Sequence, residues 1–176
     1  ILAFPGGFSF GDDLGAGTVL ANRVRTRLAD DLDAFVASGR LVIGICNGFQ
    51  ILTETGILPG ALRRNAGLKY ICRSVGLTVE NNETAFTCGY DKGQVIDVPI
   101  AHHDGNYFVT DDKLAQLRDE GRIAFTYTDN PNGSVADIAG VISRNRRVLG
   151  MMPHPERAAD EGHGGTDGVA MFRSLM

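Results

Sequence analysis

Two short segments far apart in the chain contain residue types that acyl-transfer chemistry requires. Leu41-Val-Ile-Gly-Ile-Cys-Asn-Gly-Phe-Gln-Ile-Leu52 brings an apolar run to a single cysteine, Cys46, and then changes to a helical pattern. A cysteine at the start of a helix lies in the positive field of unpaired N–H groups, which favours its thiolate form. Free cysteine is also among the most buried residue types, so this segment alone favours catalysis only slightly over packing.

The second segment presents a histidine on stiff backbone. Arg147-Val-Leu-Gly-Met-Met-Pro-His-Pro-Glu-Arg157 is typical of a strand that runs into a proline-rich turn. Prolines restrict the backbone on both sides of His154, and Glu156 lies two residues further, on the same side of an extended chain. A cysteine nucleophile needs a base, and the base needs a carboxylate that fixes its tautomer. Cys46, His154 and Glu156 supply one of each, and each follows a predicted strand, where sites form in parallel sheets.

Glycines near the start of the chain could supply donors for an oxyanion. Pro5-Gly-Gly-Phe-Ser-Phe-Gly-Asp-Asp13 places two adjacent glycines after a strand, where backbone N–H groups can face a cavity. We expect the N–H groups of Gly7 and Asn47 to form the oxyanion hole, because Asn47 directly follows the nucleophile. The segment lacks the Gly-Lys-Ser/Thr of a phosphate loop. Without Cys46, it would be read as a glycine turn leading into a solvated acidic loop.

The residues around Cys46 and His154 resemble a known family. Gly44-Ile-Cys-Asn-Gly-Phe-Gln50 and Pro153-His-Pro-Glu156 are similar to the nucleophile and base motifs of class I glutamine amidotransferases. Other segments resemble the glutaminase subunit or domain of phosphoribosylformylglycinamidine synthase, an enzyme of purine biosynthesis. These segments are Pro5-Gly-Gly-Phe-Ser-Phe-Gly-Asp12, Val79-Glu-Asn-Asn82, Ala101-His-His-Asp-Gly-Asn-Tyr107, Asn130-Pro-Asn-Gly-Ser134 and Gly150-Met-Met-Pro-His-Pro-Glu-Arg157. The resemblance covers nearly the whole chain in the expected order.

The resemblance implies a reaction and its partners. L-glutamine would be hydrolysed through a thioester on Cys46, and the ammonia would pass to an ATP-dependent synthetase that makes formylglycinamidine ribonucleotide. The partner would be a large synthetase subunit, with or without a small bridging subunit, or a fused synthetase domain. ATP and magnesium are expected on that partner, and no cofactor is expected on this chain. Glutamine contacts are implied for Gly6, Gln50, His103 and Asn106. By spacing alone, Gln50 could equally be a helix-surface amide.

Composition and charge narrow the class of protein. The 176 residues, 43% of them hydrophobic, are enough for one domain with a sizeable core. A net charge of −4 without a basic block argues against a nucleic-acid partner. Three irregularly spaced cysteines fit neither a disulfide framework nor a zinc cluster. With no signal peptide and no long apolar run, we expect a cytoplasmic protein that does not contact membranes.

A metal site is the minor interpretation of the segment at 101–107. His102, His103 and Asp104 are consecutive, so their side chains would point apart in an extended chain rather than converge on an ion. We therefore expect no metal site. The resemblance implies instead a loop that lines the glutaminase pocket.

The pattern of elements predicts an α/β fold. We expect a three-layer, doubly wound, mostly parallel sheet, flavodoxin-like as in class I glutamine amidotransferases, with an antiparallel extension. Apolar residues at three- and four-residue spacing predict one helix over residues 18–38, ended by Gly39. Residues 1–176 should form a single glutamine amidotransferase domain. Because the chain opens inside an apolar strand, we expect it to lack the family's N-terminal strand–helix–strand section.

Further elements are predicted along the rest of the chain. Strands are expected at 68–80, 94–100, 123–127, 135–142 and 148–152, and short helices at 111–119 and 166–175. The Asn-Gly pair within Asn130-Pro-Asn-Gly-Ser134 predicts a tight hairpin turn.

Two other functions stay open on the residues alone. The chain could be a different cysteine hydrolase that acts on γ-glutamyl or peptide bonds. It could also be a non-catalytic binding subunit in which Cys46 is only packed. Labelling with a glutamine-mimicking electrophile separates the catalytic interpretations from the last one, since a packed cysteine would form no adduct.

Overall fold

Three short apolar segments, widely separated in sequence, pair as neighbouring parallel strands. β1 (Leu2–Phe4) pairs with β2 (Val42–Ile45), and β2 pairs with β9 (Val148–Met151). All residues of β2 and β9 are buried, as expected for strands covered on both faces. In the computed structural model, which describes residues 1–176, the carboxyl ends of these strands lie at one edge of the sheet. Cys46 and His154 follow the ends of two adjacent strands and so lie at that edge.

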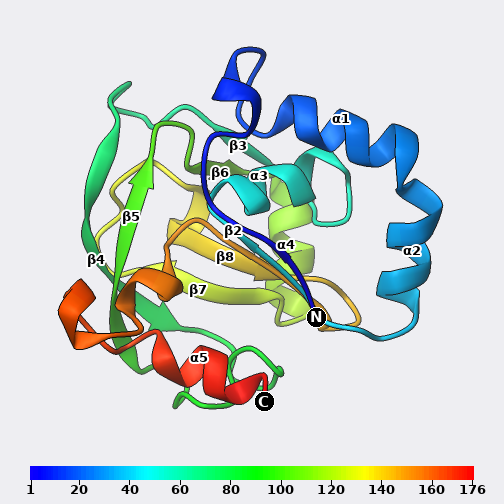
Figure 1. Ribbon diagram of the computed structural model, residues 1–176. Coiled ribbons are helices and arrows are strands. Elements are labelled where there is room, and N and C mark those ends of the chain that lie inside the picture. The colour runs from blue at the N-terminus through cyan, green and yellow to red at the C-terminus, as the bar shows by residue number, and fades with distance from the viewer.

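Four more strands continue the sheet in the order β1-β2-β9-β8-β7-β4-β5 (Figure 1). Their bounds are Ile71–Val79 for β4, Val95–His102 for β5, Ile123–Tyr127 for β7 and Ile138–Ile142 for β8. A separate two-stranded sheet pairs β3 (Ala61–Arg63) with β6 (Asn106–Phe108). The α/β class and the antiparallel extension are thereby confirmed.

The expectation of a mostly parallel sheet is wrong in its proportions. Within the seven-stranded sheet, two neighbouring pairs are parallel and four are antiparallel. Residues 143–147, which join β8 to β9, are too few for the crossover that parallel neighbours require. The extension therefore makes up the larger part of the sheet, while the parallel strands form the part that carries Cys46 and His154.

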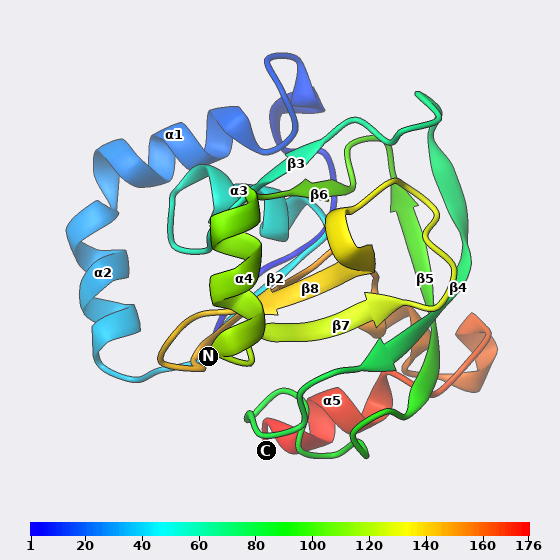
Figure 2. The ribbon, with the colours of Figure 1, turned by 180° about the vertical axis from the view of Figure 1, so that it is seen from behind.

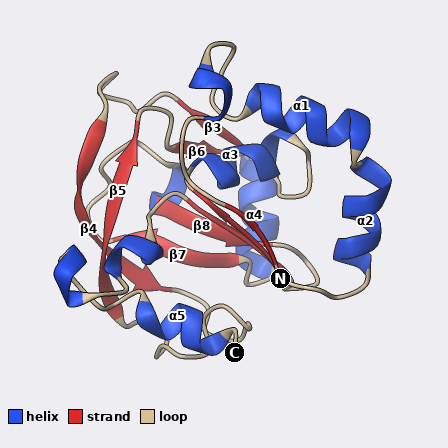
Figure 3. Cartoon of the chain, in the orientation of Figure 1, coloured by secondary structure: helices blue, strands red, loops and turns tan.

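Helices cover both sides of the sheet (Figure 3). Their bounds are Thr18–Arg27 for α1, Ala29–Ala37 for α2, Asn47–Glu54 for α3, Asp111–Asp119 for α4 and Val169–Ser174 for α5. Short 3₁₀ turns are η1 (Ser9–Asp12), η2 (Val135–Asp137), η3 (Pro155–Ala158) and η4 (Glu161–His163). The opposite views of Figures 1 and 2 show α5 in front of the sheet in one and α4 in front in the other, which gives the expected three layers. None of the helices has both the length and the apolar character needed to cross a bilayer.

The single helix predicted over residues 18–38 is wrong, because the segment forms two helices that meet at Leu28. Leu28 has φ −132° and ψ 13°, outside the helical region. Val24 and Leu32 are buried on either side of the break, so the apolar stripe continues across it. Periodicity alone could not reveal the break for this reason. The predicted end is correct, since Gly39 follows α2 with a positive φ of 76°.

The connection between β7 and β8 also differs from the tight hairpin that the Asn-Gly pair predicts. The side-chain oxygen of Asn130 accepts hydrogen bonds from the N–H groups of Asn132 and Gly133. The 3₁₀ turn η2 then occupies residues predicted as the start of a strand. Local side-chain bonding has replaced the two-residue turn here.

Candidate active site

Cys46 occupies a sharp turn between β2 and α3. Its φ of 52° and ψ of −107° are sparsely populated for a residue with a side chain, which costs on the order of 1–3 kcal/mol. The turn also requires a glycine at position 48, because a Cβ there would lie 1.9 Å from the carbonyl oxygen of Phe4. The Cys46 N–H donates to the carbonyl of Met151 at 2.8 Å. Cys46 is therefore fixed between the ends of the parallel strands, where the sequence predicted it to lie.

His154 is held by the carboxylate two residues further along the chain. Its Nδ1 lies 2.5 Å from Oε1 of Glu156, which begins the turn η3 together with Pro155. The ring is 1% exposed, and its Nε2 is buried without a hydrogen-bond partner. Since the carboxylate accepts a hydrogen bond, Nδ1 carries the proton, and the neutral ring has its lone pair on Nε2. This is the tautomer that a general base requires.

Gly6 marks the point where Cys46 and His154 come together. A Cβ built on Gly6 would lie 2.6 Å from Cε1 of His154 and 3.4 Å from Cβ of Cys46. The two side chains, separated by more than half of the chain, thus border the same small volume. Gly6 was expected to contact glutamine; in the structure, its missing side chain leaves the space that the imidazole occupies.

Neither predicted oxyanion donor forms a hydrogen bond with an oxygen atom of the chain. The N–H of Gly7 forms no hydrogen bond within the chain, and its φ of 138° favours glycine. Asn47 is the first residue of α3, so its N–H has no intrahelical acceptor. That N–H lies against the Cys46 sulfur, where it acts to lower the pKa of the thiol. The geometry is compatible with an oxyanion hole, and the assignment stays a prediction.

Burial raises the pKa of the Cys46 thiol to about 11, and this overturns the expectation of a thiolate. Desolvation is the largest cause, and it outweighs the opposing effects of the Asn47 N–H and the charge of Arg157. The sulfur lies 3.6 Å from the carbonyl oxygen of Ala101, to which the thiol can donate. Cys46 is therefore a protonated thiol in this state, and it needs a base to become a nucleophile.

The antiparallel extension supplies a wall of the site, and the segment at 101–107 that was expected to line the pocket begins within its strand β5. β5 is the last strand of the sheet, and two of its carbonyl groups on one edge reach the predicted catalytic residues. Ala101 accepts from the Cys46 thiol, and Pro99 accepts from the His154 N–H at 2.8 Å. β5, the edge strand that lies furthest from β2 in strand order, thus covers the site.

A second buried histidine lies at the end of β5. His102 is 1% exposed, and its Nδ1 lies 3.0 Å from Oδ1 of Asn65. The amide nitrogen of Asn65 donates to two backbone carbonyls, so its oxygen faces the ring and accepts a hydrogen bond from Nδ1–H. Burial, and then repulsion by His154, lower the pKa of His102 to about 4. His102 is therefore neutral near pH 7.

The predicted glutamine contacts lie around this centre with partners of their own. Gln50 is buried; its Oε1 accepts from Asn47, and its Nε2 donates to the carbonyl of Asp104 at 2.7 Å. His103 is partly exposed, with Nδ1 3.4 Å from a carboxylate oxygen of Asp104. These two consecutive side chains therefore converge, contrary to expectation. Asn106 lies against Gly133 and forms no side-chain hydrogen bond with the other predicted residues. Substrate contacts for the three stay predictions.

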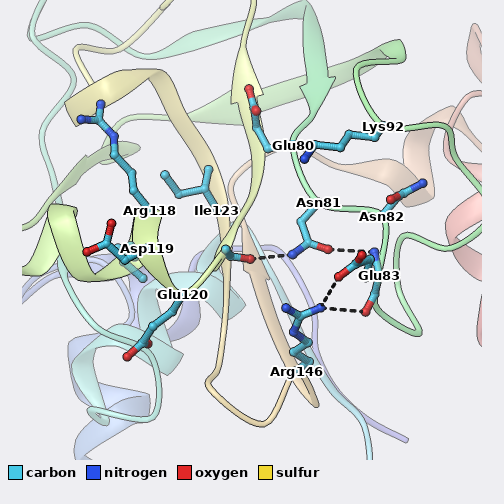
Figure 4. A pocket seen from close by; sticks show the side chains of 12 residues that line it. Glu80, Asn81, Asn82, Glu83, Lys92, Arg118, Asp119, Glu120, Ile123 and Arg146 are labelled. Carbon is cyan, nitrogen blue, oxygen red and sulfur yellow. Dashed lines mark hydrogen bonds and ion pairs between the residues drawn. The ribbon is translucent and has the colours of Figure 1, made fainter.

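A polar cleft at the surface lies away from this site (Figure 4). It encloses about 430 Å³ between the turn at 80–83, the end of α4 and Arg146. Asn81 donates to the carbonyl of Gly121, and Arg146 pairs with Glu83 at 3.0 Å. Arg146 precedes β9 whereas His154 follows it, so the cleft and the catalytic centre lie at opposite ends of that strand. No three His, Cys, Asp or Glu side chains converge as metal ligands would.

Comparisons with known proteins agree with this geometry. Residues 1–164 match the family of CobB/CobQ-like glutamine amidotransferase domains. The chain is 63% identical to phosphoribosylformylglycinamidine synthase subunit PurQ of Ruegeria sp. (strain TM1040), over 99% of this chain and 78% of that protein. This chain belongs to the PurQ family of glutamine amidotransferases. The PurQ subunit of Cereibacter sphaeroides is 57% identical over 100% of this chain and 78% of its own length.

A solved structure extends the likeness to three dimensions. PurLQS from Thermotoga maritima contains a chain that is 43% identical, with a TM-score of 0.87 over 98% of this chain and 76% of that one. The predicted membership of the PurQ family is confirmed. The prediction of a glutaminase that works in purine biosynthesis is confirmed with it.

Proposed function

We propose that the chain hydrolyses L-glutamine through a thioester on Cys46 and passes the ammonia to a synthetase subunit. The observation that carries the residue roles is that the side chains of Cys46 and His154 both border Gly6, with the imidazole held through Nδ1 and unbonded at Nε2. A base of this tautomer, beside a thiol with a raised pKa, can remove the proton that the thiol does not release by itself.

The first half of the reaction forms the thioester. Nε2 of His154 takes the Cys46 proton, and the sulfur attacks the side-chain amide carbon of glutamine. The N–H groups of Gly7 and Asn47 stabilise the oxyanion that forms on the amide oxygen. The imidazolium then donates its proton to the amide nitrogen, the carbon–nitrogen bond breaks, and ammonia leaves.

The second half restores the enzyme. His154, now neutral, takes a proton from a water molecule that attacks the thioester carbonyl. The same two N–H groups stabilise the second oxyanion. When the carbon–sulfur bond breaks, the sulfur regains a proton from the imidazolium, and glutamate leaves. Throughout, Glu156 accepts a hydrogen bond from the Nδ1–H group, which keeps the ring oriented and stabilises its charged form.

The ammonia needs an acceptor close by. In water at neutral pH, free ammonia becomes ammonium, which is not a nucleophile. The names PurQ and PurLQS of the relatives support a complex with a large ATP-dependent synthetase subunit and a small bridging subunit. ATP and magnesium would bind the synthetase, which would convert formylglycinamide ribonucleotide to its amidine. No cofactor is proposed for this chain.

The test measures glutamate formation from L-glutamine by the chain, with and without the synthetase subunits of the same organism. Cys46→Ala should abolish hydrolysis and keep complex formation. Replacing the two exposed cysteines, Cys72 and Cys88, with alanine should leave hydrolysis unchanged, which makes them matched controls. A glutamine-mimicking electrophile should add one adduct, located on Cys46 by mass spectrometry. An intact chain that forms no adduct and no glutamate in the complex would refute the proposal.

A further inference from the structure

The side chain of Asn47 joins separate parts of the site. It is 2% exposed and begins the elbow helix α3 next to the nucleophile. Its Oδ1 accepts from the N–H of Ser9 at 3.2 Å, and its Nδ2 donates to Gln50 Oε1 at 2.9 Å and Asp12 Oδ1 at 3.3 Å. The hydrogen bonds to Ser9 and Asp12 cross from α3 to the loop that follows Gly7.

These partners fix the orientation of the amide. A reversed amide would place its oxygen against the Asp12 carboxylate and the Gln50 oxygen, and its N–H groups against the Ser9 N–H. Each contact would then pair two acceptors or two donors. The observed orientation pairs a donor with an acceptor three times. An apolar side chain of the same size could make none of these bonds.

The hydrogen bond from the Ser9 N–H links the Asn47 side chain to the segment that carries the Gly7 donor. Ser9 lies two residues after Gly7, in the loop at residues 5–13, here called the glycine loop. The backbone of this loop forms no hydrogen bonds at residues 6 and 7. The two oxyanion donors come from different segments, and their N–H groups must converge on one oxygen atom. The Asn47 side chain holds the loop with the Gly7 donor against the residue that carries the other donor.

We propose that the Asn47 side chain is the positioning group of the oxyanion hole, setting the Gly7 N–H relative to the Asn47 N–H. This inference rests on the proposed glutamine hydrolysis and assigns a side chain where that proposal uses only a backbone group. The hydrogen bonds of Asn47 also continue toward the loop after β5, because its partner Gln50 donates to the carbonyl of Asp104. One run of hydrogen bonds therefore spans the glycine loop, the elbow helix and the loop after β5.

The test compares Asn47→Ala with Asn22→Ala, the same change at an exposed amide of α1. Both variants keep every backbone N–H. In the complex with the synthetase subunits, Asn47→Ala should lower kcat for glutamine hydrolysis on the order of tenfold to a hundredfold, because a small misplacement of an oxyanion donor is costly. KM should change less than about threefold, since the transition state and not the bound substrate loses the interaction. Asn22→Ala should match the unchanged chain.

Two further measurements separate positioning from damage to the fold. Alkylation of Cys46 by iodoacetamide forms no oxyanion, so its rate should be the same in Asn47→Ala and the unchanged chain. Should Asn47→Ala not fold, Asp12→Ala removes one acceptor of the same amide and should show a smaller kcat loss, with exposed Asp13→Ala as its control. The inference is overturned if kcat is unchanged in the variant that is assayed, Asn47→Ala or Asp12→Ala, or if only KM is affected. The proposed function would stand in either case. Absence of hydrolysis by the unchanged chain overturns the proposed function itself.

Discussion

Adding a single methyl group at Gly6 should disable the site without replacing any of the proposed catalytic residues. The Cβ of alanine would lie 2.6 Å from Cε1 and 3.3 Å from Nδ1 of His154. Carbon atoms in contact settle at about 3.5–4.0 Å, so the imidazole would have to retreat by about 1 Å. It is fully buried, and its Nδ1 is bonded to Glu156. The ring therefore cannot move without weakening the bond that orients it.

The expected loss follows from this displacement. A misplacement of about 1 Å typically costs on the order of a hundredfold in rate. We therefore expect kcat/KM for glutamine to fall about a hundredfold in Gly6→Ala. Overpacking should also lower the free energy of unfolding by about 1–3 kcal/mol. The loss should fall mainly on kcat, because the nucleophile and the base no longer meet.

The assay measures glutamate release in the complex with the synthetase subunits, together with thermal unfolding. Gly165→Ala is the matched control, since a Cβ there meets no atom within 4 Å. It should change neither quantity. If folded Gly6→Ala retained activity within about threefold of the unchanged chain, the packing of Cys46 and His154 around Gly6 would not be the catalytic arrangement.

Two further predictions concern the nucleophile and its turn. Because burial raises the pKa of Cys46 to about 11 from 9.0, its thiolate fraction at pH 8 should be about a hundredfold below that of an ordinary cysteine. Iodoacetamide should therefore alkylate Cys46 slowly in the isolated chain, with a rate that rises about tenfold per pH unit up to pH 10. A rate that levels off near pH 7, measured by peptide mass spectrometry, would contradict this. Gly48→Ala should prevent folding or sharply lower Tm, because its Cβ would meet backbone at 1.9 Å, whereas exposed Gly67→Ala should leave Tm unchanged.

The sequence was sufficient to predict that Cys46, His154 and Glu156 lie together, because each of them follows a local pattern. An apolar strand that meets Cys46, and prolines around His154, are visible in short windows. Parallel strands bring their carboxyl ends together whatever lies between them. These residues could therefore be placed together without any knowledge of the middle of the chain.

The part of the β5 wall formed by Pro99 had no such signal, whereas Ala101 belongs to the segment that the resemblance placed along the pocket. The contacts of β5 with Cys46 and His154 use the backbone carbonyls of Ala101 and Pro99. Every residue type has a backbone carbonyl, so residue types do not predict such contacts. The prediction of a thiolate at Cys46 was wrong for a related reason. A helix start favours the thiolate, but the depth of burial that outweighs it at Cys46 depends on how distant elements fold over the turn. The side-chain bonds of Asn47 were likewise hidden, because their partners belong to an irregular loop.

The return of β5 to the site has a consequence for the protein outside catalysis. An outermost strand offers unpaired backbone groups to which other chains can add, the usual start of aggregation. Here Pro99 offers no N–H on that edge, and its carbonyl is taken by His154. The neighbouring acceptor, Ala101, is covered by Cys46. Cys46 and His154 thereby shield the β5 edge of the sheet from self-association.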